Sequence, residues 1–380
     1  MHVHTQYSIL DGQASIPRLV DKAIANGMRG IAVTDHGDMF GIKEFFNYVN
    51  KTNGEIKDLK KKIAALESGK EESENPEAEI AACKEQLEAA KKKLFKPIFG
   101  CEMYVARRRL EDKEGKPDQS GYHLVVLAKN LKGYHNLIKL VSKAWTKGFY
   151  MRPRTDRAEL EKYHEGLIVC SACLGGEVPR RITAGQLEEA EEAIRWYKNL
   201  FGDDYYLELQ RHKATVPRAN HEVYPMQQVN EKLIEYAQKY NIKLVCTNDV
   251  HFVDEENAEA HDRLICLSTG KDLDDPNRML YTKQEWMKTR EEMNEIFADV
   301  PEALSNTVEV CDKVEFYSID HAPIMPTFAI PEDFGTEEEY RKKFTEKDLF
   351  DEFTRDENGN VVMDEAAAKA KIERLGGYEK

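Results

Sequence analysis

The sequence HVHTQYSILDG occupies residues 2–12 and places two histidines and an aspartate in one short stretch. In an extended strand His2 and His4 point to the same side, because side chains alternate between the two faces. Two imidazoles on one side of a strand end form half of a metal site, and a short loop allows Asp11 to return to the same point. The alternative is two ordinary histidines near a terminus, and the rest of the chain must separate the two interpretations.

The composition is that of a globular protein. The chain has 380 residues, of which 41% are hydrophobic and 33% are charged, enough for one large domain and a smaller one at roughly 100–200 residues per domain. No apolar run approaches the ~20 residues of a membrane span, and no secretory signal opens the chain. The seven cysteines are an odd number scattered through apolar stretches. This pattern predicts a reducing, cytoplasmic location rather than a disulfide framework.

The formal net charge is −14. This charge argues against tight, unaided binding to nucleic acid, because a surface that binds phosphates is usually basic. We therefore expect any contact with DNA to be local, assisted by metal ions, or supplied by another part of a larger protein.

Strand-like and helix-like segments alternate over about the first 270 residues. After the opening stretch, strands are expected at 30–37, 97–105, 122–128, 166–173, 205–210 and 243–252, and helices at 16–24, 40–50, 134–145, 186–200, 227–240 and 258–267. This alternation predicts an α/β fold with a parallel sheet, either open or closed into a barrel. Polar residues at the ends of several strands favour a barrel with one converging site.

Two regions depart from this alternation. Residues 51–95 are rich in Lys, Glu and Ala, and a break at 69–76 divides them, so we predict a hairpin of two antiparallel helices with solvated charges. Beyond about residue 270 we expect helices within 283–315, an irregular segment at 316–335, and a highly charged end that packs poorly alone. The predicted domains are therefore 1–270 and 271–380.

Metal-competent side chains collect at the predicted strand ends. They are His2, His4, Asp11, His36, Glu102, His123, Cys173, Asp249 and His251. A lone histidine at a strand end is more often a hydrogen-bonded or exposed residue, but this many donors at or just after six strands favour a metal centre. Nine donors exceed the four of a tetrahedral zinc site, so we predict two or three divalent ions with a bridging carboxylate. Histidine and carboxylate suit Zn²⁺, Mn²⁺ or Fe²⁺, and the thiolate favours zinc.

Such a centre points to phosphoester hydrolysis. Clustered divalent ions lower the pKa of bound water to ~7 and neutralise phosphate oxygens, so no Ser-His-Asp or Cys-His nucleophile is needed.

The sequence resembles a known family in six motifs. They are HVHTQYSILDG at 2–12, VTDHG at 33–37, GCEMYV at 100–105, YHLVVLAKN at 122–130, CSACLGGE at 170–177 and NDVHF at 248–252. These motifs resemble those of the PHP (polymerase and histidinol phosphatase) domain. More narrowly, with segments 148–154, 291–293 and 301–304, they resemble the N-terminal part of bacterial DNA polymerase III alpha subunits. The resemblance covers about residues 1–330.

The resemblance implies a distorted (β/α)7 TIM-like barrel, the PHP fold, with a trinuclear metal centre. It implies that His2, His4, Glu102 and Asp249 hold one metal, that Glu102 bridges to a second held by His123 and Cys173, and that Asp11, His36 and His251 hold a third. We take these last three as the catalytic set. In alpha subunits with all nine residues the family implies 3′–5′ exonuclease proofreading. In those that have lost several, the domain is a scaffold for the polymerase. This chain has all nine, which favours activity.

The sequence departs from the family pattern in three places. Only Met1 precedes the first histidine, so we expect a shortened first strand with an α-amino group close enough to disturb the metals. The 51–95 hairpin is an insertion. The chain reaches only the start of the polymerase palm, within 271–380, so we expect a fragment that cannot polymerise DNA.

The predicted partners are the 3′ end of a DNA primer strand and the remainder of the polymerase chain. The sliding clamp and other replisome subunits would bind through regions absent here, and no membrane is involved.

Arg152, Arg154 and Tyr7 are candidate substrate contacts, whereas Arg107–Arg109 are more readily a surface loop than a guide for DNA. The remaining histidines, His135, His164, His212, His221, His261 and His321, are taken as structural or exposed. Two other functions stay open: a catalytically silent, metal-binding scaffold, and a stand-alone phosphoesterase for small phosphate esters.

Overall fold

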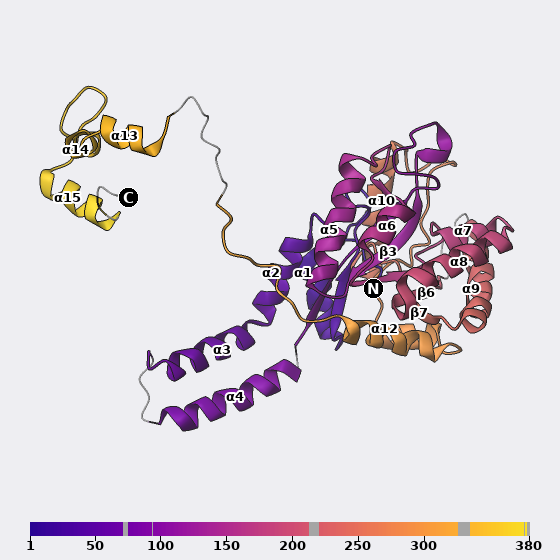
Figure 1. The fold of residues 1–380 in the computed structure, drawn as a ribbon. Helices are drawn as coiled ribbons and strands as arrows, with labels where there is room; N and C mark the ends of the chain where they lie inside the picture. The colour runs from indigo at the N-terminus through magenta and orange to yellow at the C-terminus, as the bar shows by residue number, and fades with distance from the viewer. Residues whose placement is uncertain (71–74, 93, 213–219, 326–334, 376, 378–380) are drawn as a thin grey trace. The chain divides into compact units, whose positions relative to one another are not determined.

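The computed structural model describes residues 1–70, 75–92, 94–212, 220–325, 335–375 and 377, with the backbone alone for 91–92 and 220–225 (Figure 1). The chain divides into two compact units, Met1–Ile319 and Asp320–Lys380. The predicted functional boundary near residue 270 stays a prediction, since this division reflects compactness alone.

One curled sheet forms the centre of the first unit (Figure 1). Its strands are, in spatial order, β1 (Gly30–Val33), β2 (Lys96–Val105), β3 (Tyr122–Ala128), β5 (Leu167–Cys170), β6 (Tyr205–Gln210) and β7 (Lys243–Thr247), and the short β4 (Arg154–Thr155) pairs with β2. Neighbouring strands are parallel except at β3, which is antiparallel to both β2 and β5.

The expectation of a parallel sheet is therefore wrong at β3. The segment between β2 and β3 contains a single turn of 3₁₀ helix, η1 (Lys116–Asp118), in place of a crossover helix. A connection without a crossover brings the chain back antiparallel.

The opening stretch joins the two edges of this sheet. On one side Val3 bridges Val250, just after β7, and the His4 amide donates to the Val250 carbonyl at 2.7 Å. On the other side the Thr34 amide, just after β1, donates to the Val3 carbonyl at 2.9 Å. The sheet thus curls into the predicted distorted TIM-like barrel, which is confirmed.

The barrel interior has an apolar zone and a polar zone. Near one end the inward side chains are apolar, among them Ala32, Ile98, Val125 and Val245, and they pack on α12 (Pro301–Lys313). Farther along the same strands the inward positions turn polar, as at Glu102 and Glu208, which are both buried. The period of two selects the side chains that point inward, and the order of residues along the strands places apolar ones at one end and metal donors at the other.

Helices cover the outside of the barrel, close to where the sequence predicts them. They are α1 (Ile16–Ala25), α2 (Ile42–Thr52), α5 (Leu131–Thr146), α6 (Arg157–Tyr163), α7 (Glu177–Thr183), α8 (Leu187–Phe201), α9 (Asn220–Tyr240), α10 (Ala258–Thr269) and α11 (Arg290–Ile296). In α1 the buried side chains Ile16, Leu19, Val20 and Ala23 recur at helical spacing, with a proline in the first turn.

The predicted insertion consists of two helices, α3 (Gly54–Glu67) and α4 (Pro76–Lys92). They enclose a small apolar cluster of their own, formed by Ile63, Cys83 and Leu87. At the base of the hairpin the Asn53 side chain donates to the Phe95 carbonyl at 2.8 Å. The predicted break includes residues 71–74, which lie outside the described part of the chain.

The second unit is described by itself. It contains α13 (Glu337–Lys343), α14 (Glu346–Thr354) and α15 (Glu365–Arg374), and Ala368 and Ile372 are among its few buried apolar side chains. Within the described residues of the whole chain, no helix is both long enough and apolar enough to cross a membrane.

Candidate metal centre

The opening histidines face two carboxylates inside the barrel. His2 Nε2 lies 3.1 Å from Glu102 Oε1 and 3.2 Å from Asp249 Oδ1. His4 Nε2 lies 3.2 Å from the same Asp249 oxygen and 3.9 Å from Glu102 Oε2. The strand alternation of the opening stretch thus aims both imidazoles at one point, beside the end of β7.

Glu102, on β2, lies between this pair and a second group of donors. Its Oε1 is 2.8 Å from His123 Nδ1 and 3.6 Å from Cys173 Sγ, and the thiol is 3.5 Å from the same imidazole nitrogen. The start of β3 and the turn after β5 lie side by side, because His123 bridges Gly176.

A third group includes His36, Asp11 and His251. His36 Nε2 lies 3.0 Å from Asp11 Oδ2, and His251 Nε2 lies 3.9 Å from Asp11 Oδ1. The ring of His4 stacks between the rings of His36 and His251, at centroid distances of 4.0 and 4.4 Å. The structure thus brings all nine sequence-selected donors into one continuous cluster.

Three buried atoms in this cluster form no well-aligned hydrogen bond in the described structure, although they lie within 3.2 Å of one another or of Glu102: His2 Nε2, His4 Nε2 and Asp249 Oδ1. An unpaired buried polar atom is costly, by about 1–3 kcal/mol, so native proteins rarely keep one without a ligand. Three sets of donors each have ligand atoms within 4.8 Å of one another: His2, His4 and Glu102; Glu102, His123 and Cys173; and His4, His36 and His251. These residues fit divalent metal ions.

The pKa shifts of His4 and Glu102 match the protonation states that ligands need, whereas the raised pKa values of His2, His36 and Cys173 favour their protonated forms until a cation lies beside them. Burial and the neighbouring His36 and His251 lower the pKa of His4 to about 3, so its imidazole is neutral at pH 7. Burial opposes ionisation of Glu102, but the surrounding histidines hold its pKa well below the usual range. Burial, Glu102 and Asp249 raise the pKa of the Cys173 thiol, so the thiolate requires a cation beside it.

Further side chains hold these donors, and the sequence analysis did not select them. Glu208 Oε1 lies 2.7 Å from His2 Nδ1, and Ser8 Oγ lies 3.0 Å from His4 Nδ1. The Tyr281 hydroxyl donates to Asp11 Oδ1 at 2.9 Å. Such partners orient ligating side chains. Glu208 occupies an inward position of β6, a signal that the alternation of YLELQ offered, whereas Tyr281 comes from an irregular segment without such a signal.

The three predicted substrate contacts differ in their exposure and in their partners. Arg152 is exposed and lies over the Tyr104 ring, 5.7 Å from its centroid. Arg154 is fully buried, and its guanidinium donates to the carbonyls of Gly148, Leu110 and Asp112. The expectation that Arg154 contacts substrate is corrected, because all of its donors point into protein and none reaches solvent. The Tyr7 hydroxyl donates to Glu44 at 2.6 Å, beside the opening loop.

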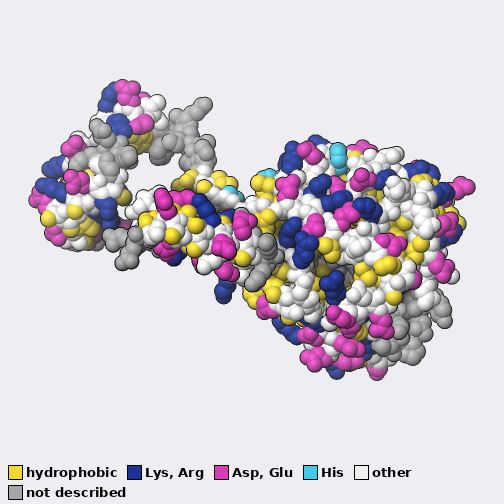
Figure 2. Space-filling view, turned by 90° about the horizontal axis from the view of Figure 1, so that it is seen from below, with side chains coloured by type: hydrophobic (Ala, Val, Ile, Leu, Met, Phe, Trp, Pro, Cys, Tyr) yellow, Lys and Arg dark blue, Asp and Glu magenta, His cyan; other side chains and the backbone are white. Residues whose placement is uncertain are grey.

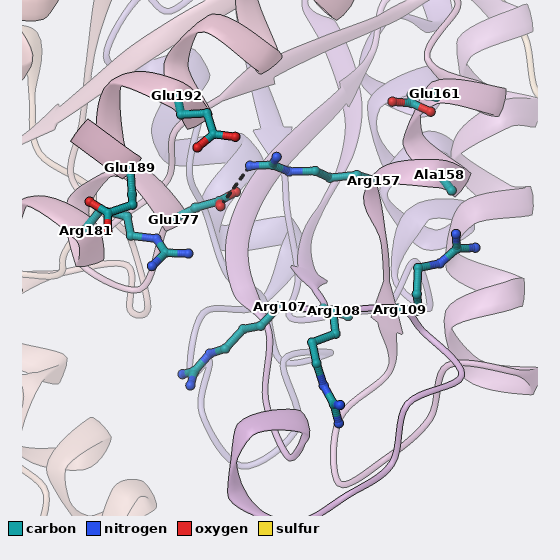
Figure 3. A pocket seen from close by; sticks show the side chains of 11 residues that line it. Arg107, Arg108, Arg109, Arg157, Ala158, Glu161, Glu177, Arg181, Glu189 and Glu192 are labelled. Carbon is teal, nitrogen blue, oxygen red and sulfur yellow. Dashed lines mark hydrogen bonds and ion pairs between the residues drawn. The ribbon is translucent and has the colours of Figure 1, made fainter. Parts of the chain in front are cut away.

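Arg107–Arg109 line a separate pocket of about 500 Å³, into which arginine and glutamate side chains from the β2–β3 loop, α6, α7 and α8 project (Figure 3). Arg108 pairs with Asp118 and Arg109 pairs with Asp156. None of the nine donors lines this pocket. The internal ion pairs support the interpretation of these arginines as a structured surface loop.

The other histidines are dispersed. His212 is buried and contacts Thr282, whereas His135, His164 and His321 are exposed. His261 is buried with its ring 5.5 Å from that of His251, so it packs against one of the nine donors. The side chain of His221 lies outside the described residues.

Comparisons with known proteins agree with this geometry. A family model described as the PHP domain matches residues 1–212. The chain is 38% identical over 348 residues to the DNA polymerase III subunit alpha of Borreliella burgdorferi, which covers 91% of this chain and 26% of that protein. The subunit of Treponema pallidum is 35% identical (98% and 27%), and that of Thermus aquaticus is 34% identical (91% and 25%). The chain spans about a quarter of the length of these relatives. It belongs to the PHP domain family and is homologous to the N-terminal region of DNA polymerase III alpha subunits.

Proposed function

We propose that this chain hydrolyses phosphodiester bonds at the 3′ end of DNA, as the exonuclease module of a DNA polymerase III alpha subunit. The observation that carries the proposal is the cluster of nine donors, in which three buried ligand atoms form no well-aligned hydrogen bond. Membership of a family of metal-dependent phosphoesterases supports it.

We assign three positions to divalent ions, Zn²⁺ or Mn²⁺ with Fe²⁺ as an alternative. His2, His4, Glu102 and Asp249 would hold the first. Glu102 would bridge to the second, held by His123 and Cys173, and Asp11, His36 and His251 would hold the third. When bound, such ions supply an activated water and neutralise the charge of the phosphate.

The chain's own residues provide position and charge. Glu208 and Ser8 fix the orientation of His2 and His4. Asp11 is held by the Tyr281 hydroxyl. Arg152, exposed beside Tyr104, is available to a phosphate oxygen of the substrate strand. Catalysis by Asp11, His36 and His251 belongs to this proposal.

The replication context is also proposed. Since the relatives are polymerase alpha subunits, we infer that residues 271–380 lead toward a polymerase palm, and that the natural partners are primer DNA, the remainder of the polymerase and the replisome, in the cytoplasm. Figure 2 shows basic and acidic side chains interspersed on the face drawn. Among the described residues, the face drawn therefore shows no broad basic patch for DNA.

The test measures release of 3′ nucleotides from single-stranded and mismatched primer DNA with Mn²⁺ or Zn²⁺. The parent chain should be active and Asp11→Asn inactive, because the variant loses a carboxylate within reach of two imidazoles. Asp58→Asn, on the exposed face of α3, is the matched control and should behave as the parent. Equal background in parent and Asp11→Asn, with metals still present by elemental analysis, would instead identify a silent scaffold. Activity confined to small phosphate esters would identify a stand-alone phosphoesterase.

A further inference from the structure

Three exposed aromatic side chains form a continuous series near the metal centre. Phe40, Trp145 and Phe149 are 54%, 40% and 45% exposed. The ring centroids of Phe40 and Trp145 are 5.7 Å apart, and those of Trp145 and Phe149 are 5.6 Å apart with the planes inclined by 22°. We call these three residues the aromatic rim. Large aromatic rings gathered in water usually mark an interaction site.

The aromatic rim is tied to the cluster of donors. The Trp145 indole donates to the Gly37 carbonyl at 2.8 Å, and Gly37 directly follows His36. The Gly37 amide in turn donates to the carbonyl of Glu102 at 2.8 Å. Tyr7 also lies beside the rim. Gly41 directly follows Phe40, and a Cβ placed on Gly41 would come within 2.6 Å of the Tyr7 ring. The rim is therefore joined through Gly37 to the segment that carries His36 and to the backbone of Glu102, two of the proposed metal donors.

A cation links the rim to the metal donors. Arg152 follows Phe149 by three residues and forms no ion pair with a carboxylate among the described residues. Its guanidinium lies over Tyr104, whose ring is 5.1 Å from that of His123 and 6.3 Å from that of His36. This region thus combines flat aromatic faces and one positive charge with a neighbouring metal-competent cluster.

We propose that the aromatic rim stacks the unpaired bases of a single DNA strand, while Arg152 binds the phosphate that leads into the metal centre. Every base has a π-face, so exposed rings bind single strands irrespective of sequence, whereas the bases of a duplex are already stacked on one another. The nearby positive charge favours a polyanion over an apolar protein segment. The inference rests on the proposed function in taking a DNA 3′ end as substrate.

The test measures binding separately from hydrolysis. A fluorescein-labelled twelve-residue oligothymidylate is titrated with the whole chain in EDTA at low salt, and fluorescence anisotropy is recorded. The parent should bind saturably. Phe149→Ala and Phe40→Ala should each bind about tenfold more weakly, the effect expected of one lost stacking contact. Phe149→Tyr should bind as the parent, because it keeps a ring.

Two controls make the result specific. Phe316→Ala removes a similarly exposed ring, 51% exposed. Its neighbour Glu315 donates its amide to the carbonyl of Lys129, which follows the last residue of β3, whereas His123 lies at the start of that strand. This variant should not change binding. An abasic oligonucleotide of equal length has the phosphates without the bases and should bind at least tenfold more weakly than oligothymidylate.

Equal affinity for the abasic strand, or unchanged binding by folded Phe149→Ala and Phe40→Ala, would overturn the inference. Failure of the parent to bind any oligonucleotide would also overturn it and would mark the rim as a protein-docking face. The two proposals fail separately. Rim-dependent binding without release of nucleotides in Mn²⁺ contradicts the exonuclease alone, whereas full exonuclease activity in Phe149→Ala contradicts the rim alone.

Discussion

At the scale of single residues, Glu102 is the most connected side chain of the cluster. One oxygen faces His2 and His123, and the other lies 2.5 Å from His36 Nδ1. The carboxylate is buried, so its charge is stable only because cationic partners surround it. In the proposed centre it would bridge two metal ions and supply negative charge to both.

Glu102→Gln should therefore lose bound metal. The amide keeps the size of the side chain but removes the negative charge, so at least one equivalent of metal per chain should be lost. Elemental analysis after gel filtration measures this. Glu161→Gln, on the exposed surface of α6, is the matched control. An unchanged metal content in Glu102→Gln would contradict the assignment.

Lys288 is a buried cation outside the cluster. Its Nζ lies 3.4 Å from the centroid of the Trp286 ring and donates to the Gln284 carbonyl. Burial lowers the pKa of Lys288 from 10.5 to about 8. The unfolded chain binds this proton more tightly than the folded chain does. Below about pH 8 the lysine is therefore charged in both states, and the free energy of unfolding is reduced by the full cost of burying the charge. This cost disappears as the pH rises toward 10.5.

Lys288→Met should increase the free energy of unfolding by about 1–3 kcal/mol at pH 7, less the lost hydrogen bond. The gain should shrink at pH 10, because the folded-state lysine is largely neutral there and the unfolded-state lysine is already losing its proton near its pKa of 10.5. Urea unfolding at the two pH values measures it. Lys57→Met, exposed on α3, should change stability by less than about 0.5 kcal/mol. An equal gain at both pH values would show that burial of the charge is not the cause.

At the scale of elements, the barrel depends on close approaches between segments. In α5 a Cβ at Gly133 would lie 1.8 Å from the carbonyl oxygen of Gly166, at the turn before β5. At the first residue of α3 a Cβ on Gly54 would meet nothing within 4 Å. The two helix glycines therefore have opposite roles, one in packing and one without a steric demand.

Gly133→Ala should destabilise the protein by about 2–3 kcal/mol, because α5 must move away from the turn. Gly54→Ala should be neutral or stabilise by up to about 1 kcal/mol, through the lower conformational entropy of the unfolded chain. Thermal unfolding of both variants measures the difference. Similar effects of the two substitutions would contradict the packing argument.

At the scale of the molecule, the α3–α4 hairpin is a self-contained addition. Its apolar cluster is formed by its own residues. Its ends are joined by two hydrogen bonds between the Asn53 side chain and the Phe95 backbone. The barrel strands on either side, β1 and β2, pair directly with each other.

Replacement of residues 54–94 by two glycines should leave the barrel folded and its metal content unchanged. Since the ends already meet, we expect less than about 1 kcal/mol change in the free energy of unfolding. Urea unfolding and elemental analysis test this on the shortened chain. Loss of folding or of metal would show that the hairpin supports the barrel.

Much of the architecture could be predicted from local patterns. Buried strands that end in polar residues and helices with an apolar stripe are each recorded within ten or so residues, and the Lys/Glu-rich insertion is recorded in the composition of one continuous segment, 51–95. The nine donors were selected in the same way, since alternation sets which face of a strand His2, His4 or Glu102 occupies. These properties depend on short-range chemistry, so the sequence alone determines them.

Other features depend on contacts between distant segments. The antiparallel direction of β3 follows from how the chain returns after β2. The burial of Arg154 depends on carbonyls from the β2–β3 loop. The support of His2 by Glu208 joins residues 206 positions apart, and the aromatic rim joins the end of α5 to the segment after His36. Only the tertiary structure decides these features, because pairing across long loops is set by the packing of the whole barrel rather than by any one segment.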